Sequence, residues 1–420
     1  MASTPECTYV CLTIKTGKRR NFLQTTDYLN KCFIFAPAQL ILKAMKFSGL
    51  RSPAKVVASL FLFPLLFSCT VDRENNDVYI GGYVQRTPDD SDKRHPDDYC
   101  AVYWLNGEPH SLGDGYESSA VNAMTLVGSD LYCAGYVRSV GGNNIAVYWK
   151  NGEEHRLTSG AYDAQVRGIC VTDLGYVLCA GEEKDGPQQK RASTKYGTDY
   201  RMIREDVAKL WINDSLSYAF SDGKLAASVS SVCVDTMGMV YMAGYDDWIF
   251  RRIASTYESY IEPRFWVNWE QIALWDRRGA ANAVAWKDGS VYVGGWVVEG
   301  ESGSEATYWQ DGIRRELEDN YGGQVKSFCF EGSDVYMAGT NGYQDVKSAV
   351  YWKNGQIVPL LEDKYRSRSS CNAIAVLDGA VYCVGSMGQS AAYWKNGKVS
   401  LLGLGAANGI VVVRKKEEGK

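Results

Sequence analysis

The stretch Ala146-Val147-Tyr148-Trp149-Lys150-Asn151-Gly152 decides the fold, because close copies of it return along the chain. Two good copies stand at 349–355 and 391–397, and looser ones at 101–107 and 306–312. A second signature, Val-Tyr-x-x-Gly, alternates with the first and occurs seven times, if the copy with Leu178 in place of Tyr is counted. Self-similarity at a fixed period indicates a repeat architecture.

Each repeat predicts four short antiparallel strands. In the last full copy these strands are 373–376, 381–385, 391–394 and 399–402. The turns Asp378-Gly379 and Asn396-Gly397 join the first strand to the second and the third to the fourth. Such dipeptides supply the positive φ that tight hairpins need. Seven four-stranded units of about 45 residues predict an all-β fold, a seven-bladed β-propeller.

The fourth repeat has two candidate tryptophans, Trp266 and Trp275. Trp266 keeps the spacing to the next Val-Tyr-x-x-Gly copy close to that in the other repeats, whereas Trp275 breaks the period. We therefore assign Trp266 to the repeat. We expect the repeat Trp and Tyr residues to lie in the core, because they recur whatever the length of the loops around them.

The last strand-like run of the chain matches the strand that the first repeat lacks. The first copy begins at Val78 with the second strand of a blade, and the run Asn408–Val413 matches a first strand. A closed ring leaves no open sheet edge, so we expect this run to join the first blade and close the propeller. The propeller would then span 77–414, with a polar tail at 415–420.

The glycine and aromatic pattern is similar to the kelch repeat, and Ala-x-x-Trp-x-Asn-Gly-x-x-x-x-Leu resembles the HAF-type extracellular repeat of bacteria. The resemblance covers about residues 77–414. Kelch proteins usually separate the Tyr from the Trp, whereas here the two adjoin, so the resemblance implies a shared architecture only. Neither family implies a particular activity.

The amino-terminal part of the chain predicts export. Lys46, Arg51 and Lys55 precede the apolar run 56–68, which is shorter than the about 20 residues of a membrane-spanning helix and suits a secretory signal. The end of this run, Leu66-Phe67-Ser68-Cys69, resembles a bacterial lipobox, whose cysteine becomes the lipidated amino terminus. The resemblance implies a cell-envelope lipoprotein, anchored through Cys69 to the outer membrane on its periplasmic or surface side.

The flanking segments follow from this assignment. Residues 45–68 form the signal peptide, and 69–76 form a short polar tether. A signal lies near the start of its protein, and 1–44 contain no repeat. We therefore expect translation to begin at Met45 and 1–44 to be an upstream extension outside the mature protein.

Composition argues against several classes of function. The net charge of −4 gives no bulk attraction to nucleic acid. Only three His are present, and none is spaced for metal binding with another His or a Cys pair. We therefore expect no metal, no cofactor and no His-based catalytic triad. No residue is assigned as catalytic, and we expect a monomer.

Longer connections gather on one face of the predicted propeller. The tight turns trim the opposite face, whereas the connections between second and third strands carry insertions at 84–99, 182–209 and 245–264. Extra loop length on one face predicts a binding face. Basic residues interleaved with aromatics can stack on sugars or hold anionic groups; the candidates are Tyr200, Arg204, Trp248 and Arg251. The alternative is a solvated insertion whose aromatics pack on the rim.

Two periodic sets of residues belong to the same face. A tyrosine recurs in the connections between repeats, at Tyr116, Tyr162, Tyr321 and Tyr365. A ring at the entrance to the first strands consists of Asn122, Asn282, Asn372 and Asn408, with Lys326 at the matching position. Such a ring could hold water, a ligand or a cation at the mouth of the channel. The same asparagines could instead satisfy backbone groups where the chain enters the strand.

Two functions are compatible with this architecture. The first is a lipid-anchored binding or scaffold module that recognises a glycan or a protein on the loop-rich face. The second is a glycan-processing hydrolase or lyase at the channel mouth, with carboxylates such as Asp246 and Asp247. Neighbouring residues of a strand point apart, which favours the binding module.

One cysteine pair is a candidate disulfide. With a two-residue turn at Leu174-Gly175, Cys170 would face Cys179 in a non-hydrogen-bonded pair, whose Cα atoms lie about 4.5 Å apart. Export would place the pair in an oxidising compartment. The alternative is two packed thiols.

Overall fold

The computed structural model describes residues 76–86, 98–192, 200–214, 216–253, 256–274, 278–299, 303–343, 346–361 and 368–415. These residues form β-strands and turns, with no helix among them. In this part of the chain, accordingly, no helix is long and apolar enough to span a membrane. The predicted all-β class is confirmed.

Five of the repeats form separate four-stranded antiparallel sheets, which we call sheets 2 to 6 after the number of the repeat. Sheet 2 contains β4 (Ser118–Val127), β5 (Asp130–Arg138), β6 (Asn144–Lys150) and β7 (Glu153–Arg156). Sheet 3 contains β8 (Ala164–Val171), β9 (Val177–Glu183), β12 (Val207–Ile212) and β13 (Leu216–Ala219). Sheet 4 contains β14 (Ala227–Val234), β15 (Val240–Ile253), β16 (Thr256–Val267) and β17 (Glu270–Ala273). Sheet 5 contains β18 (Gly279–Lys287), β19 (Ser290–Val298), β20 (Ser304–Gln310) and β21 (Ile313–Arg315). Sheet 6 contains β22 (Gln324–Glu331), β23 (Asp334–Tyr343), β24 (Val346–Lys353) and β25 (Gln356–Pro359).

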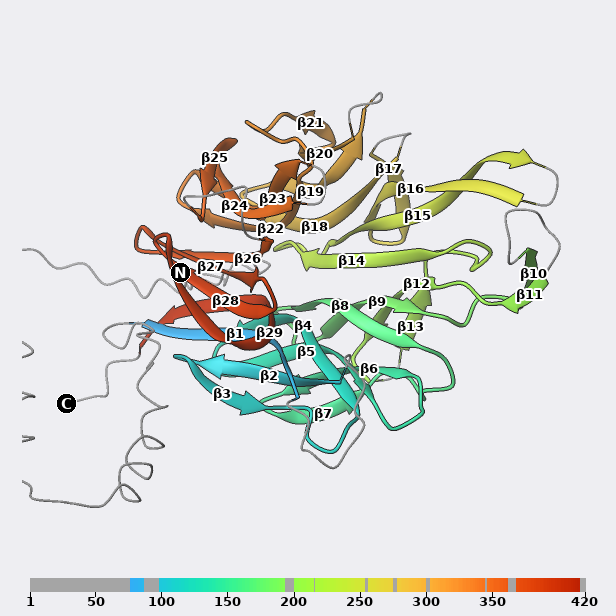
Figure 1. The fold of residues 1–420 in the computed structure, drawn as a ribbon, viewed down its shortest axis with the longest axis horizontal. Coiled ribbons are helices and arrows are strands. Elements are labelled where there is room, and N and C mark those ends of the chain that lie inside the picture. Colours follow the sequence, from blue (N-terminus) through green and yellow to red (C-terminus); the bar gives the residue numbers. More distant parts are fainter. Residues whose placement is uncertain are drawn as a thin grey trace, which may run out of the picture. The chain divides into compact units, whose positions relative to one another are not determined.

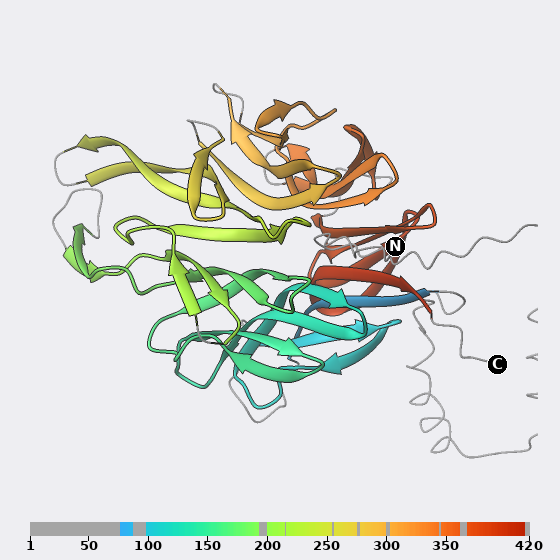
Figure 2. The ribbon, with the colours of Figure 1, turned by 180° about the vertical axis from the view of Figure 1, so that it is seen from behind.

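The last and first repeats share one seven-stranded sheet. Its order is β26 (Ser369–Leu377), β27 (Ala380–Met387), β28 (Ser390–Lys395), β29 (Lys398–Arg414), β1 (Asn76–Gln85), β2 (Tyr99–Leu105) and β3 (Glu108–Ser111). The first half of β29 pairs with β28, and its second half pairs with β1, where Val412 lies opposite Val78. Both views show β29, in red, beside β1, in blue (Figures 1 and 2). The predicted pairing of 408–413 with the first repeat is confirmed.

The first strands of successive repeats lie next to one another. β4 lies beside β8, β8 beside β14, β14 beside β18, β18 beside β22, β22 beside β26, β26 beside β29, and β29 beside β4. Figure 1 shows the sheets following chain order around a common centre. The arrangement is that of a propeller-like fold built from antiparallel four-stranded units.

The insertions contain strands of their own, which the sequence analysis did not predict. β15 and β16 pair onward from Tyr245 opposite Pro263 to Ile253 opposite Thr256, so the expected loop at 245–264 is a hairpin extension of sheet 4. The hairpin projects at the right of Figure 1. β10 (Gln189–Ala192) and β11 (Tyr200–Ile203) form a separate two-stranded sheet in the third repeat.

The repeat tryptophans lie between neighbouring sheets and are 0–3% exposed. They are Trp104, Trp149, Trp211, Trp266, Trp309, Trp352 and Trp394. Trp266 lies opposite Met242 of β15, which is the register of Trp149 opposite Cys133 in sheet 2. The assignment of Trp266 to the fourth repeat is therefore confirmed, and the burial explains why a large apolar residue recurs there.

The turn asparagine ties the third-to-fourth-strand turn to the second strand in every repeat. In sheet 6, for example, Asn354 has φ 52°, and its Oδ1 accepts from Val335 N at 2.9 Å. Its own backbone N–H donates back to Val335 O at 2.9 Å. The same side-chain bond is made at 2.8–3.0 Å by Asn106, Asn151, Asn213, Asn268, Asp311 and Asn396. Asn and Asp suit this position because they tolerate a left-handed conformation and carry a short acceptor.

A β-bulge in the first strand of each repeat explains the glycine of Val-Tyr-x-x-Gly. In sheet 2 the register shifts between Val121 and Ala123, so Asn122 is the extra residue. Gly135 lies opposite, and a Cβ there would collide with the carbonyl oxygen of Ala120. The glycines at the matching positions meet the same obstacle; they are Gly82, Gly181, Gly244, Gly295, Gly339 and Gly385.

The predicted opposition of Cys170 and Cys179 is wrong. Thr172–Tyr176 form a five-residue loop, closed by Thr172 N to Tyr176 O at 2.9 Å and Gly175 N to Thr172 O at 2.8 Å. Cys179 therefore lies opposite Ile169, and Cys170 opposite Leu178. Because side chains alternate along a strand, this shift of one residue puts the two cysteines on opposite faces of sheet 3. Both thiols are buried, in different parts of the core.

Candidate functional site

The bulge residues of the first strands form a polar set at equivalent positions. They are Asn122, Arg167, Ser230, Asn282, Lys326, Asn372 and Asn408. The predicted asparagine ring and Lys326 belong to this set, and the structure adds Arg167 and Ser230. These two lie 14 residues before their opposed glycines, Gly181 and Gly244, whereas Asn122, Asn282, Lys326 and Asn372 lie 13 residues before theirs, so the spacing of the asparagines did not find them.

The asparagines of this set connect neighbouring sheets. Asn122 Nδ2 donates to Val166 O at 2.8 Å, Asn282 Nδ2 to Val325 O at 3.0 Å, Asn372 Nδ2 to Ala407 O at 3.0 Å, and Asn408 Nδ2 to Val121 O at 2.9 Å. Each acceptor is the carbonyl that precedes the bulge of the next first strand. The backbone-satisfying role left open by the sequence therefore occupies these amides, which makes them less suited to hold a ligand.

Arg167 replaces asparagine with a charge that has a carboxylate partner. Its Nε donates to Glu182 Oε2 at 2.7 Å, and Glu182 also accepts from Gln165 Nε2 at 2.7 Å and from Ser228 Oγ at 2.5 Å. The Glu182 side chain is only 7% exposed, so its charge is held by three donors from sheets 3 and 4. This cluster has the character of a structural link between two sheets.

Lys326 replaces asparagine with a charge that has no carboxylate partner among the described residues. Its Nζ donates to Ser370 Oγ at 2.7 Å and to Asn372 Oδ1 at 2.9 Å, both neutral groups. Burial is the main cause that lowers the pKa of Lys326 to about 8; within this shift Cys371 acts to raise the pKa and the nearby Lys347 to lower it. A half-buried ammonium with neutral partners attracts an anion.

Two pockets beside Lys326 are lined by further cations. The larger, of about 630 Å³, includes Arg278, Trp296, Gln324 and Lys347 in its wall. The smaller, of about 360 Å³, includes Lys347, Arg368 and Ser370. Lys347 lies in both walls, and Ser370 accepts from Lys326, so we treat the two as one site, the cationic pockets.

The three outer cations of this site are exposed and unpaired. Within the described parts of the chain, Arg278, Lys347 and Arg368 form no ion pair, and neither pocket wall contains a carboxylate. Arg278 and Arg368 each stand directly before a first strand, β18 and β26. Unpaired basic side chains converging on a pocket are suited to carboxylate, sulfate or phosphate groups.

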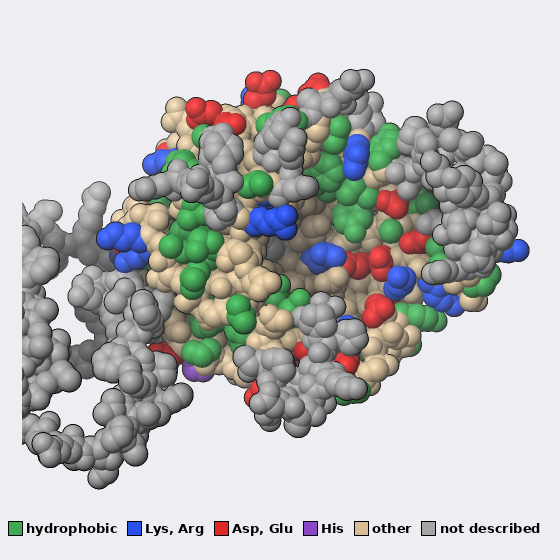
Figure 3. Space-filling model, in the orientation of Figure 1, with side chains coloured by type: hydrophobic (Ala, Val, Ile, Leu, Met, Phe, Trp, Pro, Cys, Tyr) green, Lys and Arg blue, Asp and Glu red, His purple; other side chains and the backbone are tan. Residues whose placement is uncertain are grey.

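Carboxylates gather on sheets 3 and 4 instead. Burial raises the pKa of Asp246 to about 6, with Arg264 opposing the shift and Asp247, Asp222 and Glu262 adding to it. Burial also raises the pKa of Asp206, and Glu182 adds to that effect. Figure 3 shows one face of the molecule hollowed near its middle, with basic and acidic side chains around the hollow.

The predicted tyrosines have different surroundings. Tyr116 donates to Glu154 Oε1 at 2.8 Å and accepts from Arg156 Nη2 at 2.7 Å, while its ring packs on the core. Arg204 lies 5.1 Å above the Tyr162 ring, so these two predicted residues are together but engaged with each other. Tyr321 is 38% exposed, with its hydroxyl beside Gly303 at the edge of the larger pocket.

Several predicted site residues cannot be placed. Tyr365 and the lipid-attachment residue Cys69 lie outside the described residues, as does the signal segment. The backbone of Tyr200, Trp248 and Arg251 lies in strands, but their side chains are outside what the structure describes. Among the described residues, no group of three or more His, Cys, Asp or Glu side chains is arranged to hold a metal.

The cations of the pockets escaped the sequence analysis. Arg278, Lys347 and Arg368 lie outside both repeat signatures, and only the packing of neighbouring sheets brings them together. One signal was available, since Arg278 and Arg368 occupy the same place in their repeats. The sequence does not show that Lys347 joins these two arginines, because only the fold brings the three residues together.

No family model matches the chain, and no curated protein matches it. Among solved structures it is similar to Pyrococcus horikoshii acylaminoacyl peptidase, with a TM-score of 0.43, 11% identity, and coverage of 76% of this chain and 52% of that one. It is also similar to Trypanosoma rangeli sialidase in complex with the inhibitor DANA, with a TM-score of 0.39, 9% identity, and coverage of 74% and 57%. The chain thus spans little more than half of either protein, and a likeness this distant says nothing about activity or ligand.

Proposed function

We propose that the repeats are the seven blades of one closed β-propeller. Seven copies of each repeat signature, the neighbour relations of the seven first strands, and the pairing of β29 with both β28 and β1 support this proposal. In a closed ring the long strand β29 supplies the outer strand of the last blade and the inner strand of the first.

We also propose that the propeller is exported and lipid-anchored. The support is the sequence alone: the basic residues before 56–68, the apolar run itself, and Cys69 directly after it. A tether of a few residues would then separate the lipid from the first strand, β1, which begins at Asn76. The propeller would be held close to the outer membrane, with its loop-rich face free to meet ligands.

For the propeller itself we propose a binding function, with an anionic glycan as the ligand. The observation that carries the proposal is the convergence of Arg278, Lys347 and Arg368 on the cationic pockets, with Lys326 behind them. Their charges have no carboxylate partner among the described residues, so a ligand that brings a carboxylate or sulfate would provide one.

The dimensions of the site favour a glycan over a protein partner. The pockets, of about 630 and 360 Å³, are in the range of small-ligand sites, whereas stable protein interfaces bury about 800 Å² on each partner. Trp296 and Tyr321 add aromatic surface at the larger pocket, against which a sugar ring could pack. A chain of uronic acid or sulfated sugars combines both chemistries.

The test compares binding of anionic and neutral oligosaccharides by calorimetry. We expect the double variant Lys347→Ala/Arg368→Ala to lose about 10-fold or more in affinity for uronic acid or sulfated oligomers. The matched control is Arg315→Ala/Lys398→Ala, which removes two exposed positive charges elsewhere and should bind like the wild type. Equal loss in both double variants would reduce the effect to net charge and refute the site.

A glycan-processing enzyme is the second candidate, and the raised pKa of Asp246 is the observation that favours it. A carboxyl group with a pKa of about 6 can act as a general acid near neutral pH. Asp246 and Asp247 are consecutive in β15, so they do not form a facing pair. Product release from the same oligosaccharides, lost in Asp246→Asn, would establish the enzyme; binding without turnover between pH 5 and 7 would support the binding module.

A further inference from the structure

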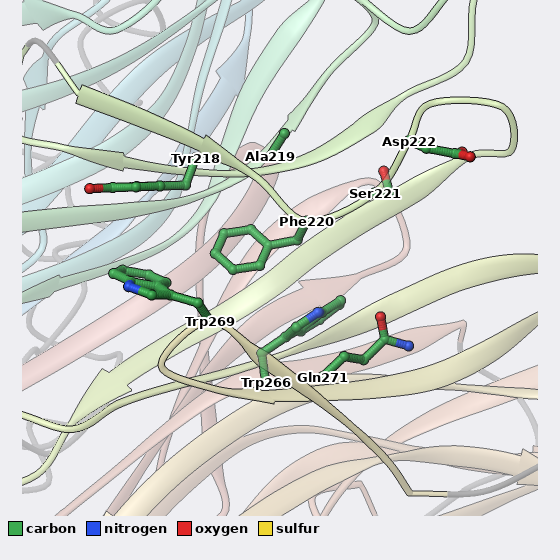
Figure 4. A pocket seen from close by; sticks show the side chains of 8 residues that line it. All are labelled: Tyr218, Ala219, Phe220, Ser221, Asp222, Trp266, Trp269 and Gln271. Atoms are coloured by element: carbon green, nitrogen blue, oxygen red, sulfur yellow. The ribbon is translucent and has the colours of Figure 1, made fainter.

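A further pocket, separate from the two cationic pockets, lies on the outer strands of sheets 3 and 4. Its wall includes Tyr218, Phe220, Trp266, Trp269 and Gln271, and its volume is about 460 Å³. The Tyr218 and Trp269 rings stack with centroids 4.8 Å apart, and Phe220 lies 5.9 Å from Trp269 (Figure 4). We call this the aromatic groove.

The groove leaves two large aromatic side chains exposed to solvent. The Trp269 side chain is 52% exposed and that of Tyr218 is 38% exposed. Trp269 occupies the turn position after Asn268, where five other repeats have glycine: Gly107, Gly152, Gly312, Gly355 and Gly397. The turn keeps its left-handed asparagine, with φ 53° at Asn268, so tryptophan there adds surface that the turn itself does not need.

Tyr218 also departs from its equivalents. In the first repeat His110 stacks on Tyr103, and in sheet 2 His155 stacks on Tyr148, each on the strand beside its own. In sheet 3 the residue opposite Tyr218 is Leu210, and the tyrosine ring lies instead against Trp269 of sheet 4. Two departures from the repeat thus meet across one boundary between sheets.

Polar groups complete the groove. Gln271 and Asp222 contribute an amide and a carboxylate to its wall, and the Lys224 side chain holds the carboxylate from outside at 2.6 Å. Figure 4 shows Gln271 on the side of Trp266, and Ser221 and Asp222 beyond Phe220. The Gln271 amide makes no hydrogen bond to the described residues, so its donor and acceptor are available to a ligand.

We propose that the aromatic groove binds an uncharged saccharide, with a pyranose ring stacked on Trp269 and Tyr218. Ring C–H groups of a sugar carry partial positive charge and match the negative face of an aromatic ring, while its hydroxyls match the amide and carboxylate. The wall contains one carboxylate and no Lys or Arg, which disfavours an anionic sugar. A groove of this volume suits one or two sugar rings.

This site is independent of the cationic pockets, and its test separates the two. Neutral hexose and N-acetylhexosamine oligomers are titrated into the whole chain, with binding followed by calorimetry and by saturation transfer from protein to sugar protons. Trp269→Gly restores the residue of the other repeats and so should fold normally; we expect it to weaken binding by about 10-fold or more. Tyr218→Ala should weaken binding in the same direction.

The matched control is Tyr176→Ala, which removes an exposed tyrosine, 49% exposed, from the turn Thr172–Tyr176 of sheet 3 and should leave affinity unchanged. Lys347→Ala/Arg368→Ala should also bind neutral sugars normally. Absence of saturable binding by the wild type, or equal binding by folded Trp269→Gly, would overturn the proposal. Binding only of anionic oligomers, unchanged by Trp269→Gly, would overturn it as well.

Discussion

Closure of the ring can be tested at one pair of isoleucines. Ile410 in β29 and Ile374 in β26 occupy the same position of the repeat, two residues after the bulge asparagines Asn408 and Asn372. Both side chains are 0% exposed. Ile374 lies in a hairpin with the strand that follows it, whereas Ile410 lies in the half of β29 that joins the chain's last repeat to its first.

The expected cost of truncation is the same at both positions. A buried Ile→Ala change costs about 2–5 kcal/mol, the sum of lost transfer energy and of the cavity left behind. A domain stability of about 5–15 kcal/mol makes either loss easy to detect. If β29 closes the ring in solution, Ile410→Ala and Ile374→Ala should destabilise the single domain by similar amounts.

Urea unfolding followed by tryptophan fluorescence measures both variants, because the repeat tryptophans are buried in every sheet. Val399→Ala is the control, since Val399 lies in the same strand, outside the closing half, and is 39% exposed. It should change stability by less than about 0.5 kcal/mol. A full loss for Ile374→Ala with a control-sized loss for Ile410→Ala would refute closure by β29.

Two further predictions concern the charge of Lys326 and the lipid attachment at Cys69. Affinity for a sulfated oligomer should fall as the pH rises from 7 to 9, because Lys326, whose pKa burial lowers to about 8, loses its positive charge over that range. In Lys326→Arg, whose guanidinium stays charged, calorimetry should show a flat profile, and an unchanged slope would exclude Lys326 as the cause. Cys69→Ser, expressed in a lipidating bacterium with labelled fatty acid, should lose the label and leave the membrane fraction. Label retained by the variant would contradict lipid attachment at Cys69.

The sequence predicts the four-stranded blade because the residues of its repeat signatures are each required by the backbone conformation at their position. The turn asparagine, as in Asn354, serves a left-handed turn and a bond to the second strand, and the glycine, as in Gly135, faces a bulge. Such requirements recur with every blade, so they are visible as a period. The register in which two strands pair is harder to predict from the sequence. Leu174-Gly175 has the composition of a two-residue turn, but the loop runs from Thr172 to Tyr176, and this shift of one residue reverses the face of every side chain of β9 relative to β8.

The candidate sites are predicted only in part, for a related reason. The periodic asparagines were found, yet their amides are used between sheets, as Asn122 to Val166 O illustrates. Arg278, Lys347 and Arg368 carry no periodic signal and are united only by packing. Likewise, nothing in a single repeat reveals that Tyr218 and Trp269 belong to one groove, because the two rings meet across a boundary between sheets.

Departures from the repeat within this chain are more informative about function than the repeat itself. Lys326 gives up the amide-to-carbonyl bond that asparagine makes to the next first strand, and its charge has to be stabilised by Ser370 and Asn372. Trp269 leaves a ring half exposed where glycine serves the turn in other repeats. Both side chains contact the neighbouring sheet, Lys326 through Ser370 and Asn372 and Trp269 through the Tyr218 ring, but other repeats show that the fold does not require them. Trp269 lies in a pocket wall and Lys326 contacts one through Ser370, and we therefore interpret these two departures as binding features. The two sites differ in chemistry, one cationic and one aromatic, so we expect them to select different sugars.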